Sequence, residues 1–550
     1  MRIGVDLDNT IICYDALFHA LALERGWIAP ARPVRPVRKD AVRRAVRLLP
    51  DGDEKWQALQ AEAYGPRLAS AALFPGVVDA FRLWREQGRE IFVISHKTRR
   101  SSAGYDLHAA ARAFLAESAL MREGLLAEQD LFFCPSRREK LERIARLGCD
   151  VFIDDLPEVL NEPGFPAGVR KILFAPEEAS SGRPGDAPDS VPDVRDCSAL
   201  IFRSWAEAAA WDPEADAAVT RATGSAARRL ERVAGGRNSR VWKAVPAAAP
   251  PVAVKRYPDD GRDRLGAESA AFALLRRHGL TCAPETLALF PERRLAVYSW
   301  IAGEPAAPLG DAPEAVDPFA DLIERLRRIG AAPDAIPDAA RLPLATEACL
   351  CLADVKRQVE NRLSRLLARD PDTEAARAML DLVRNKVAPA WEERLRAASE
   401  AYARLGRPPD QALEPAERVL SPSDFGAHNA IRRPDGSLAF VDFEYFGWDD
   451  PVKLTADFLL HPAMRLTREQ KERFAARVMG LFAESDAPAR LPALLPLFAV
   501  RWICIVLNVF LPEHAGARRS GDPSAPSAAP SPETQLETAR CLLRTVNLGM

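Results

Sequence analysis

Two carboxylates follow the first apolar run of the chain, at the point where a strand would end. Ile3-Gly4-Val5 leads into Asp6-Leu7-Asp8. Open α/β sheets bind ligands at the ends of strands, and two carboxylates there can act as a nucleophile or metal ligand and as a group that transfers a proton. The pattern is weak alone, because acidic residues at strand ends are also common helix caps.

Three later segments would bring further polar groups to the same edge. Ile91-Phe92-Val93-Ile94 ends in Ser95, Lys140 opens an expected helix after a basic turn, and Val151-Phe152-Ile153 ends in the pair Asp154-Asp155. Short apolar runs of this kind alternate with helical stretches, which predicts βα units and a parallel sheet. Read singly, Ser95 and Asp155 are helix caps and Lys140 is a solvated lysine. Their convergence favours a catalytic site.

The order and type of these residues resemble the haloacid dehalogenase (HAD) superfamily over about the first 205 residues. The resemblance implies an α/β fold, a Rossmann-like parallel sheet with a small helical cap at about residues 15–72. It also implies a Mg²⁺-dependent phosphatase that forms an aspartyl-phosphate on a phosphorylated small molecule. The long stretch between the first two apolar runs agrees with an inserted cap.

In that resemblance Asp6 attacks phosphorus, and Asp8 protonates the leaving oxygen and later activates water. Ser95 would hydrogen-bond the phosphoryl group, and Lys140 would offset the charge of nucleophile and phosphate. The implied magnesium ligands are Asp6, Asp8, Asp154 and Asp155, and the resemblance leaves open which of the last two touches the metal. His96 and Lys97 can also reach a substrate, but a solvated turn explains them equally well.

A second set of residues lies in the C-terminal half of the chain. Lys255 ends the run Val252-Ala253-Val254, and Glu268 follows in an expected helix from which it can pair with the lysine. Protein kinases place a lysine that grips the α/β-phosphates and a helical glutamate in this way. Gly235-Gly236 precedes a strand and permits close approach to phosphate, although a hairpin turn is an equally good reading.

The strongest segment supplies a base and two oxygen ligands. Asp424 and Asn429 share the loop that follows Val419-Leu420-Ser421, and Asp442 follows the next strand, Leu438-Ala439-Phe440-Val441. One carboxylate can accept a hydroxyl proton while the other two groups ligate a metal.

These residues resemble the aminoglycoside phosphotransferase and choline kinase-like branch of the protein-kinase fold, over about 290 residues. The resemblance implies a bilobal α+β domain in which Asp424 is the catalytic base, Lys255 contacts ATP phosphates and Glu268 orients the lysine. Asn429 and Asp442 would ligate Mg²⁺. The remaining matches are Gly235 and Gly236 over the nucleotide, a hinge at residues 298–305, and Gly447, Asp450-Pro451 and Asp457 after the metal-binding Asp.

The chain departs from this family directly before the base. Pro422 occupies the position of the family's histidine and Ser423 that of its glycine. Because Asp424 and Asn429 remain, we expect altered loop packing rather than lost catalysis. His428 either substitutes in part for the missing histidine or is a buried loop residue.

Composition sets the broader limits. The 550 residues include 75 Lys+Arg and 77 Asp+Glu, which excludes a basic field that would recruit nucleic acid or an anionic membrane. Nine scattered cysteines predict reduced thiols in a cytoplasmic protein. The apolar segment 491–512 contains prolines and Arg501, which favours a buried helix over a membrane span. We expect domains at 1–205 and 225–550, a joining segment at 206–224, and a flexible loop at 518–533 before a short last helix.

The leading interpretation is a bifunctional enzyme, a HAD-type phosphatase joined to an ATP-dependent kinase of small-molecule hydroxyls. In the alternative, only the phosphatase half does chemistry and the kinase-like half binds nucleotide or substrate, as the Pro422 departure allows. A non-catalytic scaffold is the third possibility, which the intact acidic residues and lysines argue against. Neither substrate nor the oligomeric state follows from the sequence.

Overall fold

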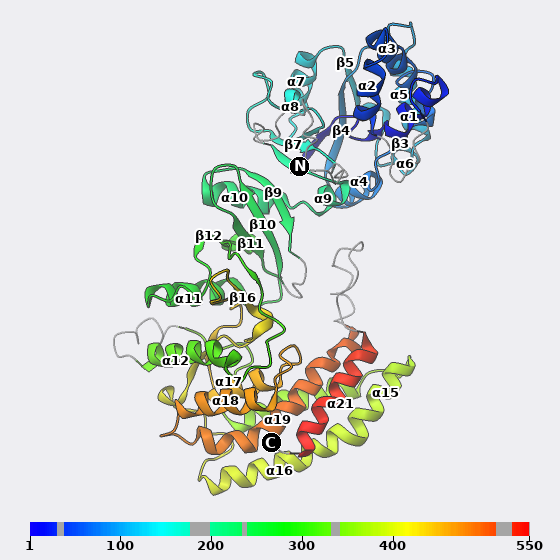
Figure 1. Cartoon of the computed structure of the whole chain (residues 1–550). Coiled ribbons are helices and arrows are strands. Elements are labelled where there is room, and N and C mark those ends of the chain that lie inside the picture. The colour runs from blue at the N-terminus through cyan, green and yellow to red at the C-terminus, as the bar shows by residue number, and fades with distance from the viewer. Residues whose placement is uncertain (30–37, 177–198, 234–238, 332–341, 513–530, 549–550) are drawn as a thin grey trace. The chain divides into compact units, whose positions relative to one another are not determined.

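A six-stranded sheet organises the N-terminal part of the chain in this computed structural model, which describes residues 1–29, 38–176, 199–233, 239–331, 342–512 and 531–548 (Figure 1). Its strand order is β5-β4-β1-β6-β7-β8, and every neighbouring pair is parallel. The strands span Arg2–Val5 (β1), Glu90–His96 (β4), Leu131–Cys134 (β5), Val151–Asp154 (β6), Arg170–Phe174 (β7) and Leu200–Phe202 (β8). The predicted parallel sheet is therefore confirmed, with β5 and β8 as strands that the sequence analysis missed.

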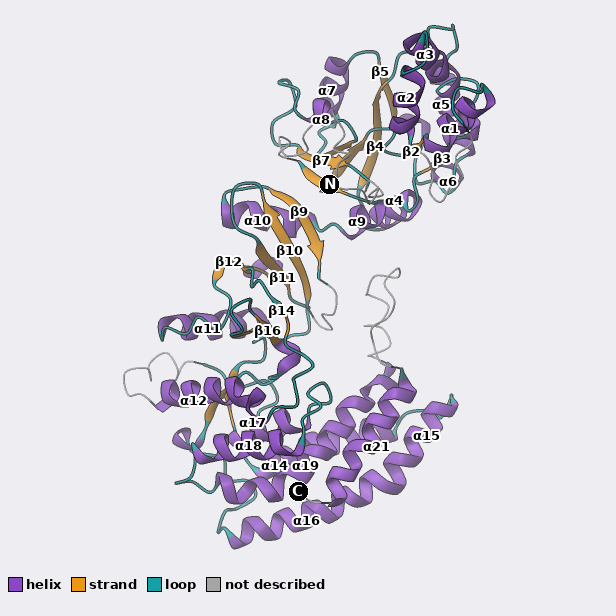
Figure 2. Ribbon diagram, viewed as in Figure 1, coloured by secondary structure: helices purple, strands orange, loops and turns teal. Residues whose placement is uncertain are grey.

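Helices cover this sheet (Figure 2) and an insert interrupts the chain after β1. The strands Ile12–Cys13 (β2) and Ala72–Leu73 (β3) pair antiparallel and bound the insert. Between them lie Asp15–Glu24 (α1), Lys39–Arg47 (α2) and Gly52–Ala63 (α3), so the insert is helical in its described residues, as expected for 15–72. The other helices are Val77–Glu86 (α4), Leu107–Glu117 (α5), Ala119–Arg122 (α6), Arg137–Arg146 (α7), Pro157–Leu160 (α8), Trp205–Ala210 (α9) and Pro213–Thr223 (α10).

A second, five-stranded sheet has the order β12-β13-β11-β10-β9. Its strands span Ala227–Arg232 (β9), Arg240–Pro246 (β10), Val252–Arg256 (β11), Thr286–Phe290 (β12) and Leu295–Ser299 (β13), and the helix Arg264–Arg277 (α11) lies between β11 and β12 in sequence. Three short strands follow in the order β14-β16-β17: Glu304–Pro305, Ala430–Arg432 and Leu438–Phe440. Val419–Ser421 (β15) pairs with Gly447–Asp449 (β18).

The rest of the chain is mainly helical. The helices are Asp317–Ala331 (α12), Leu352–Leu367 (α14), Glu374–Leu382 (α15), Ala388–Arg404 (α16), Pro451–Leu460 (α17), Arg468–Gly480 (α18), Ala487–Leu507 (α19) and Pro532–Leu548 (α21). The last helix has 17 residues, so the expectation of a short one was wrong. The loop expected before it, 518–533, lies largely outside the described residues.

Helix α19 contains the apolar segment that sequence alone leaves as a membrane suspect. Residues 487–510 are long and apolar enough to cross a membrane, with a mean hydropathy of 2.1, but 72% of that window is buried inside the protein. It packs against α14, α16, α17 and α21. This packing is that of a core helix, as expected.

The chain divides into two compact units, residues 1–233 with 242–252 and residues 234–241 with 253–550. The predicted joining segment, 206–224, consists of α9 and α10 and falls within the first of them. The cysteines that the structure describes are all free thiols.

Gly447 provides a test of the packing in the second unit. A Cβ at this position would lie 2.4 Å from the backbone nitrogen of Ala345 and 2.5 Å from the carbonyl oxygen of Pro343, and real Cβ atoms do not approach backbone so closely. Because backbone cannot yield as a flexible side chain does, we expect Gly447→Ala to lower the free energy of unfolding by about 1–3 kcal/mol. Urea denaturation of the full chain would measure the loss.

Gly480 is the matched control. It ends α18, and an added Cβ there would meet nothing within 4 Å. We expect Gly480→Ala to be neutral or slightly stabilising, because alanine is the better helix former. Equal stability of the two variants would contradict the packing described around β18.

Candidate active sites

Lys140 lies between two carboxylates at the edge of the parallel sheet. Its Nζ is 2.6 Å from Asp6 Oδ1 and 2.6 Å from Asp154 Oδ2, and its side chain is only 2% exposed. Ser136 caps α7 by accepting a hydrogen bond from the Glu139 N–H, which places Lys140 in the first turns of the helix. The structure thus brings together residues that the sequence analysis took from three separate segments.

A third carboxylate makes this cluster a fit for a divalent cation. Asp6, Asp154 and Asp155 offer oxygen atoms that lie within 4.8 Å of one another, against the single ammonium of Lys140. Burial raises the pKa of Asp6 to about 7, with Asp154 and Asp8 adding to the rise and Lys140 opposing it. Burial and the neighbouring Asp154 raise the pKa of Asp155 well above its usual range. Oxygen ligands with excess negative charge are what Mg²⁺ prefers.

Asp155 and Asp154 differ in their surroundings. Asp154 accepts hydrogen bonds from Lys140 and from the Leu156 N–H. Within the described part of the chain, no residue donates a hydrogen bond to the Asp155 carboxylate. Asp155 is therefore the carboxylate of this pair with more capacity left for a ligand.

Asp8 does not join the three carboxylates. Its Oδ2 lies 2.7 Å from Lys97 Nζ, and its Oδ1 accepts a hydrogen bond of 2.5 Å from the Tyr14 hydroxyl. Burial raises the pKa of Asp8, but Lys97 and the hydrogen bonds outweigh it, so the pKa is lowered overall. Asp8 is not among the three carboxylates whose oxygens lie within 4.8 Å of one another, and its magnesium contact stays a prediction. Lys97 is 4% exposed, so the reading of this lysine as part of a solvated turn was wrong.

Two hydroxyls of the first unit are buried without a partner in the described part of the chain. The Ser95 and Thr10 hydroxyls are buried, and neither has a hydrogen-bond partner among the residues that the structure describes. Ser95 lies in β4, whose register with β1 pairs Val93 with Val5, so the serine stands beside the segment that carries Asp6. A buried hydroxyl without a partner is costly, and a phosphoryl oxygen would satisfy it.

The helical insert contributes residues that sequence reasoning missed. Lys39, at the start of α2, donates from Nζ to Tyr64 Oη at 2.8 Å and to Asn9 Oδ1 at 3.2 Å. No local pattern marks a lysine at the start of a basic helix as a site residue, because this role depends on how the insert folds back. The insert thus brings a positive charge close to the Asp6–Asp8 segment.

In the second unit, Lys255 contacts three carboxylates. Its Nζ lies 2.7 Å from Glu268 Oε2, 2.5 Å from Asp442 Oδ1 and 3.5 Å from Glu444 Oε2. Burial lowers the pKa of Lys255, but the three carboxylates outweigh it and the pKa is raised. The pairing of Lys255 with Glu268 that the sequence analysis expected is present.

Backbone contacts hold Glu268 and Asp442 together. The N–H of Phe443 donates to Glu268 Oε1 at 3.0 Å, so α11 is tied to the segment after β17. Burial raises the pKa of Asp442 to about 6, opposed by Lys255 and reinforced by Glu444 and Glu268. Asp442 has a left-handed backbone, with φ of 67°. A cation beside Asp442 would favour its ionised form.

Glu444 is a site residue that the sequence analysis did not list. It is 2% exposed, accepts a hydrogen bond of 2.7 Å from the Ser239 hydroxyl and is paired with Arg264. Its position two residues after Asp442, in the segment that the sequence already indicated as a site, was the available signal.

The loop between β15 and β16 carries Asp424 and Asn429. Asn429 donates from Nδ2 to the Asp424 carbonyl at 2.9 Å, and its own carbonyl accepts from the Val441 N–H at 2.9 Å. These contacts place Asn429 beside Asp442. Phe425 anchors the loop in the core, with its ring 5.5 Å from Phe440.

The loop before and after Asp424 has two features that the family pattern does not predict. Ser423 has a φ of 70°, a left-handed conformation that glycine adopts at little cost, and it follows Pro422 directly. His428 Nε2 lies 2.9 Å from Asp424 Oδ1. The other predicted nucleotide-binding residues, Gly235 and Gly236, lie outside the described residues.

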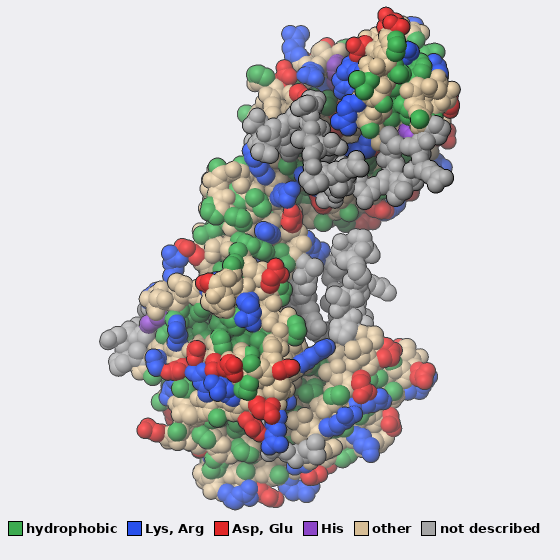
Figure 3. Space-filling model, viewed as in Figure 1, with side chains coloured by type: hydrophobic (Ala, Val, Ile, Leu, Met, Phe, Trp, Pro, Cys, Tyr) green, Lys and Arg blue, Asp and Glu red, His purple; other side chains and the backbone are tan. Residues whose placement is uncertain are grey.

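Charge at the surface is mixed. On the face that Figure 3 shows, Lys and Arg side chains are interspersed with Asp and Glu over the C-terminal unit. This agrees with the formal net charge of -2. Phosphate would therefore meet single buried lysines here, not a broad basic surface.

Comparisons with known proteins bear on the second of these sites. Similar solved structures include a choline/ethanolamine kinase family protein from Mesorhizobium loti, at 16% identity and a TM-score of 0.37, covering 58% of this chain and 88% of that chain. Spectinomycin phosphotransferase in complex with ADP and spectinomycin is 10% identical, with a TM-score of 0.40 and coverage of 60% and 96%. Choline kinase from Streptococcus pneumoniae is 15% identical, with a TM-score of 0.37 and coverage of 58% and 92%. Likenesses this weak carry no argument about the present chain.

The family comparison is more specific. No curated protein matches the chain. The model of the Phosphotransferase enzyme family (APH) matches residues 229–494, a range that contains Lys255, Glu268, Asp424, Asn429 and Asp442. The match supports a phosphotransferase domain over residues 229–494, which are 266 of the 550 residues of the chain.

Proposed function

We propose that the second unit transfers the γ-phosphoryl group of ATP to a hydroxyl of a small molecule. The observation that carries this proposal is the contact of Lys255 with both Glu268 and Asp442, at 2.7 and 2.5 Å. A lysine held in this way can contact nucleotide phosphates while the neighbouring carboxylate ligates a metal. The family match over residues 229–494 supports the reaction class.

The polar residues of this second site have proposed roles. Asp424 accepts the proton of the acceptor hydroxyl. The oxygen of that hydroxyl forms a bond to the γ-phosphorus, while the bond between the γ-phosphorus and the departing oxygen of ADP breaks. Asn429 and Asp442 hold Mg²⁺, and Glu268 orients Lys255. Mg²⁺, when bound, supplies positive charge that offsets the phosphate charge. The residues fit this ion, because Asp442 lies among Glu268 and Glu444 with only Lys255 and Arg264 to balance them.

Asp442→Ala tests nucleotide binding. We expect Mg-ATP to raise the melting temperature of the wild-type chain and the variant to lose that shift, because the variant lacks the proposed metal ligand. Asp435→Ala is the control, since Asp435 is an exposed residue of the turn between β16 and β17. Differential scanning fluorimetry with and without Mg²⁺ measures both, and an undiminished shift in Asp442→Ala would rule out the assignment.

We further propose that the first unit is a HAD-type phosphatase. The specific observation is Lys140, which bridges Asp6 after β1 and Asp154 of β6. The buried Ser95 hydroxyl of β4 has no hydrogen-bond partner among the described residues. Asp6 would attack phosphorus, Lys140 would offset the developing charge and Ser95 would donate to a phosphoryl oxygen. Asp8, held by Lys97 and Tyr14, would transfer the proton to the leaving oxygen.

The metal of this proposed phosphatase is Mg²⁺, held by Asp6 and by Asp155 with Asp154. Its chemistry, when bound, is to screen the charge between nucleophile and phosphate. Asp8 is proposed here for proton transfer alone, because its carboxylate faces Lys97. Lys39 of the insert would attract the negative charge of a phosphorylated substrate.

Asp6→Asn tests the phosphatase. We expect hydrolysis of p-nitrophenyl phosphate in the presence of Mg²⁺ to fall by at least about a hundredfold, because an amide is a far weaker nucleophile than a carboxylate. Asp79→Asn, at a position in α4 whose side chain is 77% exposed, should keep the wild-type rate. Equal rates in Asp6→Asn and wild type would exclude Asp6 as the nucleophile.

The proposed enzyme is thus bifunctional and cytoplasmic, and it acts on a phosphorylated metabolite at one site and on a hydroxyl acceptor at the other. The alternative is a kinase-like unit that binds nucleotide without transfer. ADP release over a panel of hydroxyl acceptors separates the two: a Mg-ATP shift in melting temperature without release of ADP favours the alternative.

A further inference from the structure

Two histidines contact the carboxylate of the proposed base. His428 Nε2 lies 2.9 Å from Asp424 Oδ1, and His461 Nε2 lies 3.5 Å from the same oxygen. The two imidazole rings stack on each other, with centroids 4.0 Å apart and planes within 6°. His428 belongs to the loop of Asp424, whereas His461 directly follows α17, so two separate elements meet at one oxygen atom.

His461 is held in place from the helical side. Its ring meets the Trp502 ring edge-on at 4.8 Å, and Trp502 donates from Nε1 to Asp457 Oδ1 at 2.8 Å. Asp457 belongs to α17, one turn before His461. The position of the His461 ring therefore depends on the packing of α17 and α19.

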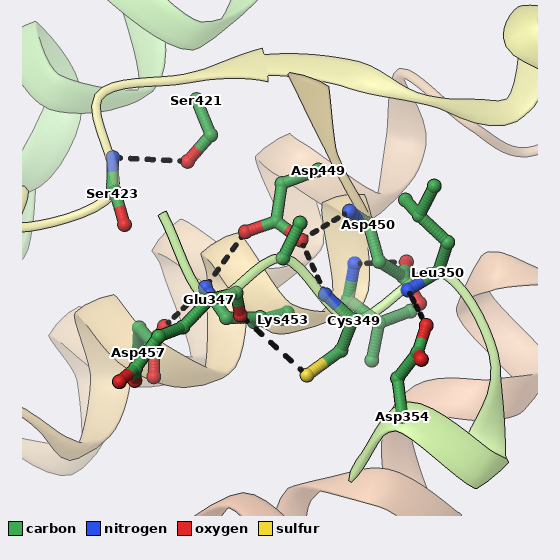
Figure 4. A network of polar contacts seen from close by, with 12 residues as sticks. Glu347, Cys349, Leu350, Asp354, Ser421, Ser423, Asp449, Asp450, Lys453 and Asp457 are labelled. Atoms are coloured by element: carbon green, nitrogen blue, oxygen red, sulfur yellow. Dashed lines mark hydrogen bonds and ion pairs between the residues drawn. The ribbon is translucent and has the colours of Figure 1, made fainter. Parts of the chain in front are cut away.

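A buried ionic network in turn fixes α17. Figure 4 shows Lys453 between two carboxylates, Asp449 at 2.7 Å and Asp457 at 3.1 Å. Asp449 also accepts a hydrogen bond of 3.1 Å from the Cys349 N–H. Because Lys453 is 1% exposed, removal of either carboxylate would leave a buried charge poorly compensated, and the helix is held in one orientation.

Hydrogen bonding defines the tautomer of His461. Its Nδ1 accepts a hydrogen bond of 3.2 Å from the Ala463 N–H, so this nitrogen carries no proton. In the neutral ring the proton then resides on Nε2, which faces Asp424 as a donor.

The same tautomer is favoured for His428. Its Nδ1 is buried and has no partner in the described part of the chain. A proton there would be a buried donor without an acceptor, so Nε2 is the nitrogen that donates, toward Asp424.

The tautomers bear on whether the two histidines bind the Asp424 carboxylate or bind a metal ion together with it. Asp424, His428 and His461 place one ligand atom each within 4.8 Å of the others, which is close enough for a cation. A metal, however, needs the lone pair of Nε2, and in His461 that nitrogen bears the proton. Donation to the carboxylate fits the geometry better than metal ligation.

We propose that His428 and His461 are positioning residues that hold the Asp424 carboxylate at Oδ1, His428 by a hydrogen bond of 2.9 Å and His461 by a polar contact of 3.5 Å. The family that this loop resembles has a histidine at the position of Pro422, whereas this chain has His428 and His461 beside the base. The inference rests on the proposed phosphotransferase function. It adds His461, which lies far from the loop in sequence and which no sequence motif indicated.

The roles of His428 and His461 can be tested by substitutions that remove their N–H groups but keep the packing of their rings. Phenylalanine keeps the stacked ring but removes the donor, and glutamine places an N–H near the position of Nε2. The probe is release of ADP from Mg-ATP by the full chain with water as the acceptor. We expect His428→Phe/His461→Phe to lower kcat by about ten- to a hundredfold with the KM for ATP within about twofold, because hydrogen bonds to a charged group are lost while ATP contacts remain.

The glutamine variants and a remote histidine complete the design. His428→Gln/His461→Gln should recover most of the lost kcat, and His278→Phe, an exposed residue at the end of α11, should not change it. A wild-type kcat in the double phenylalanine variant, or equal losses in the phenylalanine and glutamine variants, would overturn the proposal.

Nitrogen NMR of the imidazoles separates failure of this inference from failure of the proposed function. Both rings should show a proton on Nε2, and Asp424→Asn should shift both sets of signals. A proton on Nδ1 of His461, or ligation of added Zn²⁺ by the pair, would overturn the inference whatever the activity. A wild-type chain that neither binds nor turns over Mg-ATP would instead overturn the proposed function, and with it the catalytic role of the pair.

Discussion

A buried lysine between carboxylates from different elements is the constraint on which each candidate site depends. Lys140 joins Asp6 after β1 to Asp154 at the end of β6, and Lys255 of β11 joins Glu268 of α11 to Asp442 after β17. An ammonium that loses its hydration is costly unless acidic partners surround it. The strands and helices that carry these acids must therefore reach one point, and that requirement fixes the local fold around each site.

The same charges explain why each site suits phosphate and a divalent cation. In each case the carboxylates outnumber the buried lysine that they contact, as Asp6, Asp154 and Asp155 do around Lys140. Burial then raises the pKa of Asp6 to about 7 and that of Asp442 to about 6, which means that positive charge is still needed to ionise them fully. A divalent cation and a phosphate bring charges of both signs. Together they can balance the buried carboxylates and lysine of each site without a basic surface.

Local pattern was sufficient for much of the fold. The runs ending at Val5, Ser95 and Asp154 were recognisable as strands because β-branched residues cluster there, and Lys255 and Glu268 were recognisable as a pair from their spacing. The strands β5 and β8 were missed although Leu131–Cys134 is an apolar and aromatic run. Short runs of this kind do not distinguish a strand from a buried helical segment.

Tertiary contacts account for the site residues that could not be predicted. For Lys97 the sequence left a substrate contact and a solvated turn open, and the structure shows a lysine buried against Asp8. His461 reaches Asp424 from the end of α17, a helix that an ionic network holds. Neither position has a local signal, since the partner lies far away in sequence. The loop with Pro422 and a left-handed Ser423 departs from the family pattern. The base contacts one histidine of this loop, His428, and one from outside it, His461.

We propose that Lys255 and Lys140 serve two independent phosphate sites, and a crossover experiment distinguishes them. Lys255→Met and Lys140→Met would each be assayed in the full chain for ADP release from Mg-ATP and for hydrolysis of p-nitrophenyl phosphate. We expect Lys255→Met to lose ADP release and keep hydrolysis, and Lys140→Met to lose hydrolysis and keep ADP release. Loss of both activities in either folded variant, or of neither, would contradict it.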